Sequence, residues 1–305
     1  MARRKKKKLG LGGSLLLAAL LILAYFLYPY LTESTPPAPD NDQGNAAVVG
    51  EVSVHVIDVG QADAILLVAP EGNMLIDAGE RTNASETALK NYLDALGITT
   101  LDYFVATHNH SDHIGGADMI LREYTVKNML MTDIVASTGV YNDMLTALEA
   151  SDATVIEAVP DLTFSIGEMS CRVLGPLKRY SDTNDQSIVL RVTFGEVSMM
   201  FSGDAEGNRE GESEKDLVAK YSAAELQSDF YKAGHHGSDT SSSTAFLQKV
   251  SPNIIAISVG EGNKYGHPIQ SVLDAFTAMG AEVHRTDREG DLVFVCDGEN
   301  IVFQK

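Results

Sequence analysis

The chain has 305 residues, of which 44% are hydrophobic and 7% aromatic, and its formal net charge is −19. This composition is that of a globular protein, long enough for one large domain or two small ones. Six basic residues fall within the first eight, so the remainder carries 17 Lys and Arg against 42 Asp and Glu. Such an acidic surface repels polyanions unless a local patch or bound metal ions offset it, which argues against a simple nucleic-acid-binding protein.

The N-terminal segment has the pattern of a membrane anchor. Residues 3–8 are all basic, and residues 9–31 contain no charged side chain and are mostly apolar, long enough to span a bilayer as a helix. The segment ends in Tyr28-Pro29-Tyr30 and not in small residues, which favours an uncleaved anchor over a cleaved signal peptide. The positive-inside rule then predicts a single-pass cell-membrane protein, with residues 1–8 as a cytoplasmic tail and the remainder extracellular.

Residues 32–50 are rich in Pro, Asn, Asp and Gly and predict a flexible linker, whereas residues 51–305 show no comparable break and predict one domain. Strands are predicted at 52–58, 64–68, 74–77, 101–106, 126–131, near Val155, Phe164 and Val173, at 187–194, 197–201, 230–233 and 253–259, and near Val283, Val293 and Val302. Helices are predicted at 84–96, 117–124, 140–151, 212–227, 244–250 and 269–279. Runs of strands interrupted by helices in both halves predict an α/β fold, a four-layer αββα sandwich of two packed sheets with helices outside.

The densest group of metal-ligand residues follows the predicted strand 101–106. His108, His110, Asp112 and His113 lie within six positions, ahead of a Gly115-Gly116 turn into a helix. A tight turn after a strand can point alternate side chains at one centre, and imidazole with carboxylate is the donor set expected for zinc or a similar ion. Three of the eight histidines are here, so we interpret the loop as a metal site and not as a polar surface loop.

Three later stretches are candidates to complete this centre, because each follows or flanks a predicted strand. The first ends in Asp204, the second contains His235 and His236, and the third contains His267. Adjacent histidines point in different directions, so one of His235 and His236 is expected to bind metal directly, and the residues alone leave open which one. His55 and His284 lie inside strand patterns and are interpreted as structural.

The two cysteines, Cys171 and Cys296, lack metal-binding spacing, so any metal is held by His and carboxylate. They are too few for a disulfide framework. Buried thiols and a single bridge both remain open.

With these residues in place, the domain resembles metallo-β-lactamase-fold hydrolases, whose H-x-H-x-D-H signature matches residues 108–113. More narrowly, it is similar to the C-terminal extracellular domain of ComEC-type competence proteins. The matching stretches are residues 58–64, 75–79, 108–113, 201–204, 234–238 and 265–268. One departure is Ala62, where the narrower pattern more often has Gly.

The resemblance implies two divalent metal ions, Zn or Mn. His108 and His110 would bind one ion, Asp112 and His113 the other, Asp204 would bridge them, and His235 would complete the second site. Many superfamily members have a further histidine before the bridging aspartate, but this chain has none between His113 and Asp204. The first site is therefore expected to be poorer in nitrogen and more tolerant of manganese. Asp58, Asp63 and Asp77 are expected to orient the ligands or fix turns.

The resulting functional hypothesis is a membrane-anchored extracellular phosphodiesterase or nuclease that uses a metal-bound hydroxide. Asp112 would orient that nucleophile, and His236 or His267 would contact the substrate or protonate the leaving group. The expected partners are a phosphoester substrate such as DNA, the membrane through residues 9–31, and DNA-uptake or cell-envelope components. The alternatives are a hydrolase of a small or cell-wall-linked phosphoester of the phosphocholine type, and a membrane-tethered binding protein with a vestigial site.

Overall fold

The computed structural model describes residues 50–304. The predicted basic tail, the predicted membrane segment of residues 9–31 and nearly all of the predicted linker lie outside the described residues. Within residues 50–304, no helix has both the length and the apolar character needed to cross a membrane.

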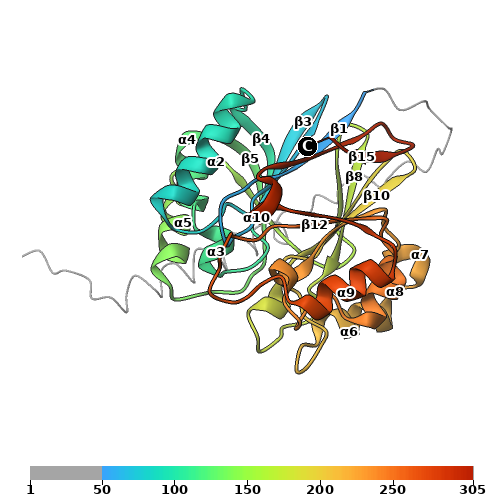
Figure 1. Cartoon of the computed structure of the whole chain (residues 1–305). Coiled ribbons are helices and arrows are strands. Elements are labelled where there is room, and N and C mark those ends of the chain that lie inside the picture. Colours follow the sequence, from blue (N-terminus) through green and yellow to red (C-terminus); the bar gives the residue numbers. More distant parts are fainter. Residues whose placement is uncertain (1–49, 305) are drawn as a thin grey trace, which may run out of the picture. The chain divides into compact units, whose positions relative to one another are not determined.

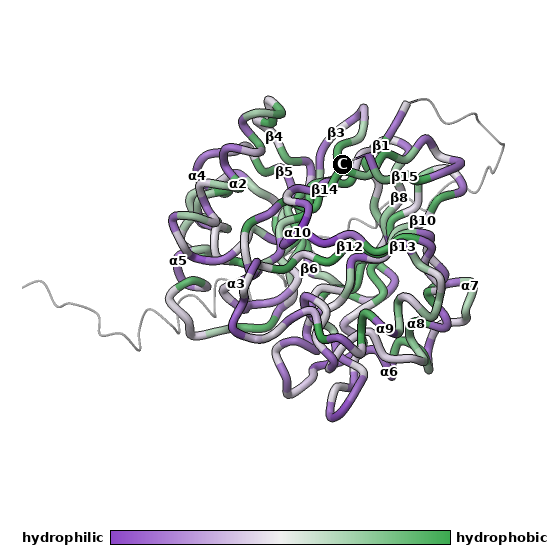
Figure 2. Tube along the Cα trace, viewed as in Figure 1, coloured by the Kyte–Doolittle hydropathy of each residue, from purple (hydrophilic) through white to green (hydrophobic). Residues whose placement is uncertain are grey.

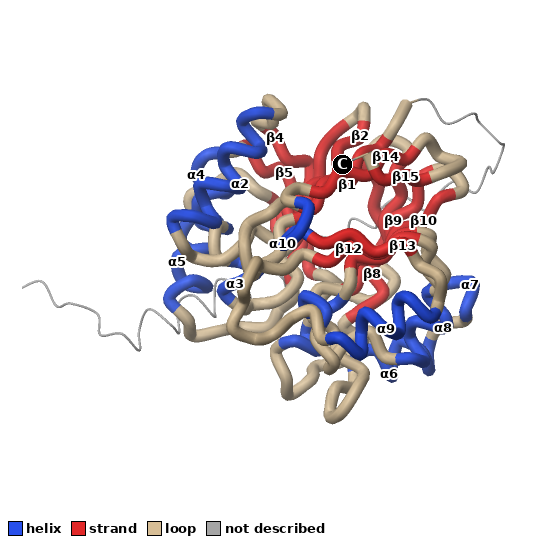
Figure 3. Tube along the Cα trace, viewed as in Figure 1, coloured by secondary structure: helices blue, strands red, loops and turns tan. Residues whose placement is uncertain are grey.

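Two β-sheets form the centre of the domain (Figure 3). Within the described residues, the first sheet has eight strands in the spatial order β15 (Ile301–Phe303), β14 (Leu292–Cys296), β1 (Val52–Val56), β2 (Ile65–Ala69), β3 (Gly72–Ile76), β4 (Thr100–Val105), β5 (Thr125–Met131) and β6 (Thr154–Glu157). The second has seven, in the order β13 (Glu282–Arg285), β12 (Ile254–Ile257), β11 (Phe230–Lys232), β10 (Val197–Phe201), β9 (Val189–Phe194), β8 (Met169–Gly175) and β7 (Thr163–Ile166).

The facing surfaces of the two sheets share one apolar core. Figure 2 shows the strands as predominantly hydrophobic segments, as expected of strands that are covered on both faces. Val54 of β1 and Val192 of β9 are both fully buried in this core. Cys171 and Cys296 lie in the same core as free, buried thiols, which decides the choice that the sequence left open.

Helices cover the outer faces of both sheets (Figure 1). The outer core of the first sheet includes apolar residues from α2 (Asn83–Ala95), α4 (Ala117–Glu123) and α5 (Gly139–Glu149). The outer core of the second sheet includes apolar residues from α6 (Ser213–Lys220), α8 (Thr244–Val250) and α9 (Gln270–Ala278). The α/β arrangement of two sheets with helices outside is therefore confirmed.

One predicted helix was wrong in its extent. The segment 212–227 is not continuous but forms α6 and a separate short helix, α7 (Ala223–Leu226). Tyr221 is extended at the break, and its buried hydroxyl donates a hydrogen bond to the Leu174 carbonyl. Ser222 then begins α7 in a capping box with Glu225, which supplies the partners that a new helix start needs.

The strand directions bring the predicted motifs to one edge of each sheet. Strands β3 to β6 run parallel in the first sheet, and β10 to β13 run parallel in the second. Each motif follows the carboxyl end of a strand. The loops after β3 and β4 therefore share one edge of the first sheet, and the loops after β10, β11 and β12 share one edge of the second sheet. Parallel topology therefore gathers side chains that are far apart in the sequence.

Gly115 marks a close approach between two of these loops. It follows the short helix α3 (Ser111–Ile114), and its N–H donates to the Gly79 carbonyl over 2.8 Å. Its φ of −56° is available to any residue, so conformational freedom is not the reason for glycine here. A Cβ at this position would collide with backbone atoms of Glu80 and Arg81, which leave no space for a side chain.

We expect Gly115→Ala to lower the free energy of unfolding by about 2 kcal/mol or more, because the backbone of residues 79–81 must move. Gly139→Ala is the matched control. Gly139 begins α5 with nothing near its Cβ position, so this change should leave stability unchanged or raise it by up to about 1 kcal/mol. Urea unfolding of both variants measures the difference, and equal stabilities would contradict the steric argument.

Candidate metal centre

Three loops of the first sheet are hydrogen-bonded to one another through their backbones. The Asp63 N–H donates to the Asp112 carbonyl over 3.0 Å, and the Ala78 N–H donates to the His113 carbonyl over 2.7 Å. The Gly79 N–H in turn donates to the Asp63 carbonyl over 2.8 Å. These bonds fix the loops after β1, β3 and β4 as one unit, so the directions of their side chains are set before any ligand binds.

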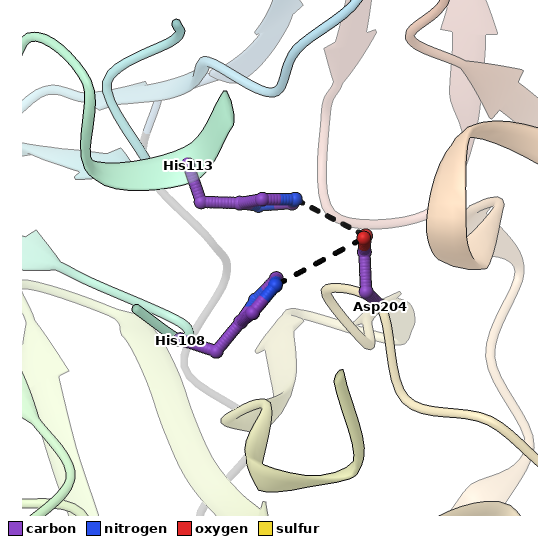
Figure 4. A group of neighbouring side chains, drawn as sticks. All are labelled: His108, His113 and Asp204. Carbon is purple, nitrogen blue, oxygen red and sulfur yellow. Dashed lines mark ion pairs between the residues drawn. The ribbon is translucent and has the colours of Figure 1, made fainter. Parts of the chain in front are cut away.

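His113 is held by Asp77 on one side and faces Asp204 on the other. Its Nδ1 lies 2.7 Å from Asp77 Oδ2, and both side chains are fully buried. Asp77 also accepts hydrogen bonds from the N–H and hydroxyl of Thr107, over 2.8 and 2.7 Å. Because Nδ1 is occupied, Nε2 is the free ring nitrogen, and it lies 3.2 Å from Asp204 Oδ1 (Figure 4).

His108 approaches the same carboxylate from a second direction. Figure 4 shows its ion pair with Asp204. Its Nε2 lies 3.9 Å from Asp204 Oδ2 and 3.1 Å from Nδ1 of the exposed His110. Its Nδ1 lies 3.2 Å from the hydroxyl of Ser187, which accepts the Asp204 N–H over 3.0 Å. The two oxygens of Asp204 therefore face different histidines, a geometry suited to bridging two cations.

The neighbouring histidines of the loop after β11 diverge, as the sequence predicted. Both have positive φ, 49° for His235 and 54° for His236, in the short turn Gly234–Gly237. The Nε2 of His235 lies 3.6 Å from Asp204 Oδ2, and the Nε2 of His236 lies 3.5 Å from Asp112 Oδ2. This arrangement favours His236 over His235 beside Asp112 and His113, the reverse of the sequence-based assignment.

Each of these two histidines has its Nδ1 held by the protein. The Nδ1 of His235 lies 3.1 Å from Glu206 Oε1, and that of His236 lies 3.0 Å from the Ser258 carbonyl and 3.2 Å from Asp63 Oδ1. Support at Nδ1 fixes the ring orientation and leaves Nε2 as the donor atom. The pattern repeats that of Asp77 and His113.

Lys232 is a component of the site that the sequence analysis missed. It is 1% exposed at the end of β11, and its Nζ donates to Asp63 Oδ2 and to the Ala233 carbonyl, each over 2.8 Å. This contact joins the second sheet to the loop after β1 and holds the carboxylate that supports His236. The available signal was a lysine in an apolar strand, two positions before the Gly-His-His sequence.

The stretch 182–187, which occupies the interval without a histidine, also supports the site. Asp185 is buried and accepts backbone N–H groups of Glu206, Glu212 and Ser213 over 3.0 to 3.1 Å. It thereby fixes the loop after β10, which carries Glu206 to His235. Ser187 from the same stretch connects His108 to Asp204.

The electrostatics of the cluster show how the carboxylates and imidazoles balance. Burial lowers the pKa of His113, but the carboxylates of Asp204 and Asp77 outweigh it, and the pKa stands well above its usual value. Burial also opposes charge on His236, yet Asp63 and Asp204 raise its pKa to about 10. The charges of His113, His235 and His236 hold the pKa of Asp204 well below its usual range, against the effect of burial. The raised pKa values favour protonated imidazoles, whose charge balances that of the buried carboxylates. A bound cation would displace these imidazole protons.

The residues present fit a divalent metal ion. Two groups, His108–His113–Asp204 and Asp112–His113–His236, each have ligand atoms within 4.8 Å of one another. In the described part of the chain, His113 Nε2, His236 Nε2 and Asp204 Oδ1 are buried without a hydrogen-bond partner. Buried polar atoms without a partner are costly unless they bind something, and a set of nitrogen and carboxylate ligands suits zinc or manganese.

The remaining predicted residues divide between the site and the scaffold. His267 is near the cluster, with its ring centroid 5.6 Å from that of His235. Asp58 fixes its own turn by accepting the Gly60 N–H over 3.2 Å. His55 contacts Ser53 and Tyr92, and His284 contacts Glu282 and Glu289, which agrees with their interpretation as structural residues.

Comparison with known families agrees with this geometry. A family model described as the metallo-beta-lactamase superfamily matches residues 57–260, which is more than half of the chain. The chain belongs to the metallo-beta-lactamase superfamily. Members of this superfamily are generally hydrolases and typically bind divalent metals, as the buried His and Asp groups of this metallo-beta-lactamase domain would allow.

Among characterised sequences, the domain is similar to three proteins named for competence or recombination. It is 31% identical to ComE operon protein 3 of Bacillus subtilis over 261 residues, which cover 80% of this chain and 33% of that protein. It is 30% identical to competence protein ComA of Neisseria gonorrhoeae over 90% of this chain and 35% of that protein. Recombination protein 2 of Haemophilus influenzae is 28% identical over 78% of this chain and 28% of that protein. The matched region thus spans about a third of each relative.

Solved structures show the same fold at low sequence identity. The metallo-beta-lactamase fold protein YhfI from Bacillus subtilis superposes with a TM-score of 0.56 at 14% identity, covering 81% of this chain and all of YhfI. Igni18, a metallo hydrolase from Ignicoccus hospitalis, gives a TM-score of 0.52 at 15% identity, covering 79% of this chain and 98% of Igni18.

We expect Asp77→Asn to weaken metal binding about 10- to 100-fold, because the amide no longer fixes the tautomer and orientation of His113. Competition with a chelator of known affinity measures this change. Asp274→Asn, an exposed carboxylate on α9, is the matched control and should bind metal as the unmodified protein does. Unchanged affinity in Asp77→Asn would show that this carboxylate does not support the site.

Proposed function

We propose that this protein is a metal-dependent phosphodiesterase, anchored in the cell membrane through residues 9–31 with its domain outside the cell. The observation that carries the proposal is the buried carboxylate of Asp204, whose two oxygens face two separate groups of imidazoles. Such a carboxylate would hold two divalent ions together with the histidines, and these ions would supply an activated water at neutral pH and positive charge for the phosphoester.

The geometry supports a specific division of ligands between the two ions. His108, His110 and His235 would hold the first ion together with Asp204 Oδ2. Asp112, His113 and His236 would hold the second together with Asp204 Oδ1. In this assignment His235 supplies the nitrogen that the sequence lacks between His113 and Asp204, so the first site has three imidazoles after all.

The other polar side chains of the site would act on substrate and water. Asp112 is ionised at neutral pH: burial opposes its charge, but the hydrogen bond and charges of His236 and His113 bring its pKa to about 2. It would therefore orient the attacking water as well as bind metal. His267 has a buried Nδ1 without a hydrogen-bond partner in the described chain and lies beside His235, where it would contact a bound phosphoester.

The names of the related proteins favour a nucleic-acid substrate, and DNA-uptake or cell-envelope components are the corresponding partners. A phosphocholine-type ester is the second enzyme hypothesis. A vestigial binding protein is less well supported, because hydrogen bonds hold Nδ1 of His113, His235 and His236 and leave Nε2 of each ring available as a ligand atom.

Hydrolysis of bis-p-nitrophenyl phosphate by the full-length protein with Mn²⁺ or Zn²⁺ tests the activity. We expect His108→Ala and Asp204→Ala each to lower kcat at least about 100-fold, since each disrupts metal binding. His284→Ala removes a histidine outside the cluster and should retain activity. Circular dichroism checks that all variants are folded. Hydrolysis at the unmodified rate by a metal-free His108→Ala, Asp204→Ala double variant would refute the proposal.

The division of ligands predicts that His235→Ala and His236→Ala lose different ions. With Mn²⁺ as probe, the unmodified protein should bind two ions, and each variant about one. The electron paramagnetic resonance spectrum of His236→Ala should match that of Asp112→Ala, and the spectrum of His235→Ala should match that of His110→Ala. Identical spectra for His235→Ala and His236→Ala would show that both histidines serve the same ion.

A further inference from the structure

The loop after β12 is built to hold two aromatic rings beside the metal centre. The Asn263 side chain donates to the carbonyls of Gly260 and His267, over 3.0 and 2.7 Å. Its Oδ1 accepts the backbone N–H groups of Tyr265 and His267, each over 3.1 Å. One half-buried amide thus fixes the positions of Tyr265 and His267 in a loop that has no regular secondary structure.

A row of three rings in contact, those of Tyr265, His267 and His235, leads toward the cluster. The ring of Tyr265 stacks on that of His267 at a centroid distance of 5.7 Å and an interplanar angle of 26°. The ring of His267 meets that of His235 edge-on at 5.6 Å. Two ring contacts therefore separate Tyr265 from a side chain that faces Asp204. The two centroid distances along this row are 5.7 and 5.6 Å. At roughly 3.4 Å per stacked nucleotide, the path from Tyr265 to His235 corresponds to a few nucleotides at most.

The side chain of Tyr265 is an aromatic ring that is largely exposed to solvent. It is 55% exposed, and it is the only aromatic residue among the exposed large hydrophobic side chains of residues 50–304. The Nζ of Lys264 lies 5.0 Å from its ring centroid. Within the described chain Lys264 forms no ion pair with a carboxylate, so this cation is available to an anion on an otherwise acidic protein.

We propose that Tyr265 and Lys264 form a nucleotide subsite, in which the ammonium group of Lys264 leaves the ring to bind a backbone phosphate and a base of single-stranded nucleic acid stacks on Tyr265. The inference rests on the proposed function, because it places a nearby phosphodiester of the same strand at the metal centre. Every base has a π-face, so stacking on one exposed ring accepts any sequence. A duplex keeps its bases stacked on one another and offers Tyr265 no free face.

The same geometry disfavours a phosphocholine-type group at this position. Quaternary ammonium groups bind aromatic faces through cation–π attraction. Here the ammonium group of Lys264 lies 5.0 Å from the centroid of the Tyr265 ring, close enough to repel a second cation. A neutral base beside a phosphate has the complementary arrangement of charge.

The test compares two oligonucleotides of equal length and charge. One is a fluorescein-labelled oligothymidylate with phosphorothioate linkages, which resist hydrolysis, and the other is its abasic counterpart. Fluorescence anisotropy measures the affinity of the full-length protein for each in the presence of Mn²⁺. We expect the oligothymidylate to bind about tenfold more tightly than the abasic strand, because a stacked base contributes on this scale.

The variants separate the ring from the charge. Tyr265→Ala should abolish the preference for the strand with bases, whereas Tyr265→Phe should retain it. Lys264→Ala should weaken both strands equally and reduce the salt dependence of binding. Leu96→Ala removes an exposed apolar side chain at the end of α2 and should change neither affinity.

Equal binding of both strands by the unmodified protein would overturn the inference. So would a preference that survives Tyr265→Ala, or one that is lost equally in Tyr265→Phe. These outcomes are independent of turnover. A base preference without hydrolysis of bis-p-nitrophenyl phosphate would refute the proposed function and leave the subsite standing, and hydrolysis without a base preference would do the opposite.

Discussion

The buried carboxylate of Asp204 is the constraint on which the rest of the site depends. It follows β10 in the second sheet, while His108 and His113 follow a strand of the first sheet. The cluster therefore forms only when the two sheets pack in one relative position. Burying one carboxylate among several imidazoles is favourable only if protons or metal ions balance the charge. The depressed pKa of Asp204 and the raised pKa of His113 are two expressions of that balance.

The surrounding contacts keep this charged cluster rigid. Backbone hydrogen bonds join the loops after β1, β3 and β4, and the absence of a side chain at Gly115 lets two of them touch. The buried pair of Lys232 and Asp63 connects the second sheet to the same unit. A carboxylate or carbonyl holds Nδ1 of His113, His235 and His236, so Nε2 of each is presented toward the centre. Preorganisation of this kind is what metal-dependent hydrolysis requires.

Sequence reasoning succeeded where one local pattern was sufficient. The succession of strands and helices predicted the two-sheet α/β fold, because apolar periodicity and turn residues are local signals. The helix predicted across residues 212–227 was wrong because the break at Tyr221 depends on a hydroxyl contact with Leu174, far away in the sequence. Lys232 was missed for a similar reason: its partner, Asp63, lies 169 positions away.

The sequence by itself determined which residue types could bind metal, since His108 to His113 form a local signature and Asp204 and His235-His236 each follow a strand. It could not decide which of the adjacent histidines faces which part of the cluster. That choice depends on left-handed backbone conformations at both residues and on supporting carboxylates from two different sheets. The exposure of Tyr265 and its ring contacts with His267 likewise come from the folded loop. Contacts between distant segments are not encoded in local spacing, and only the tertiary structure decided them.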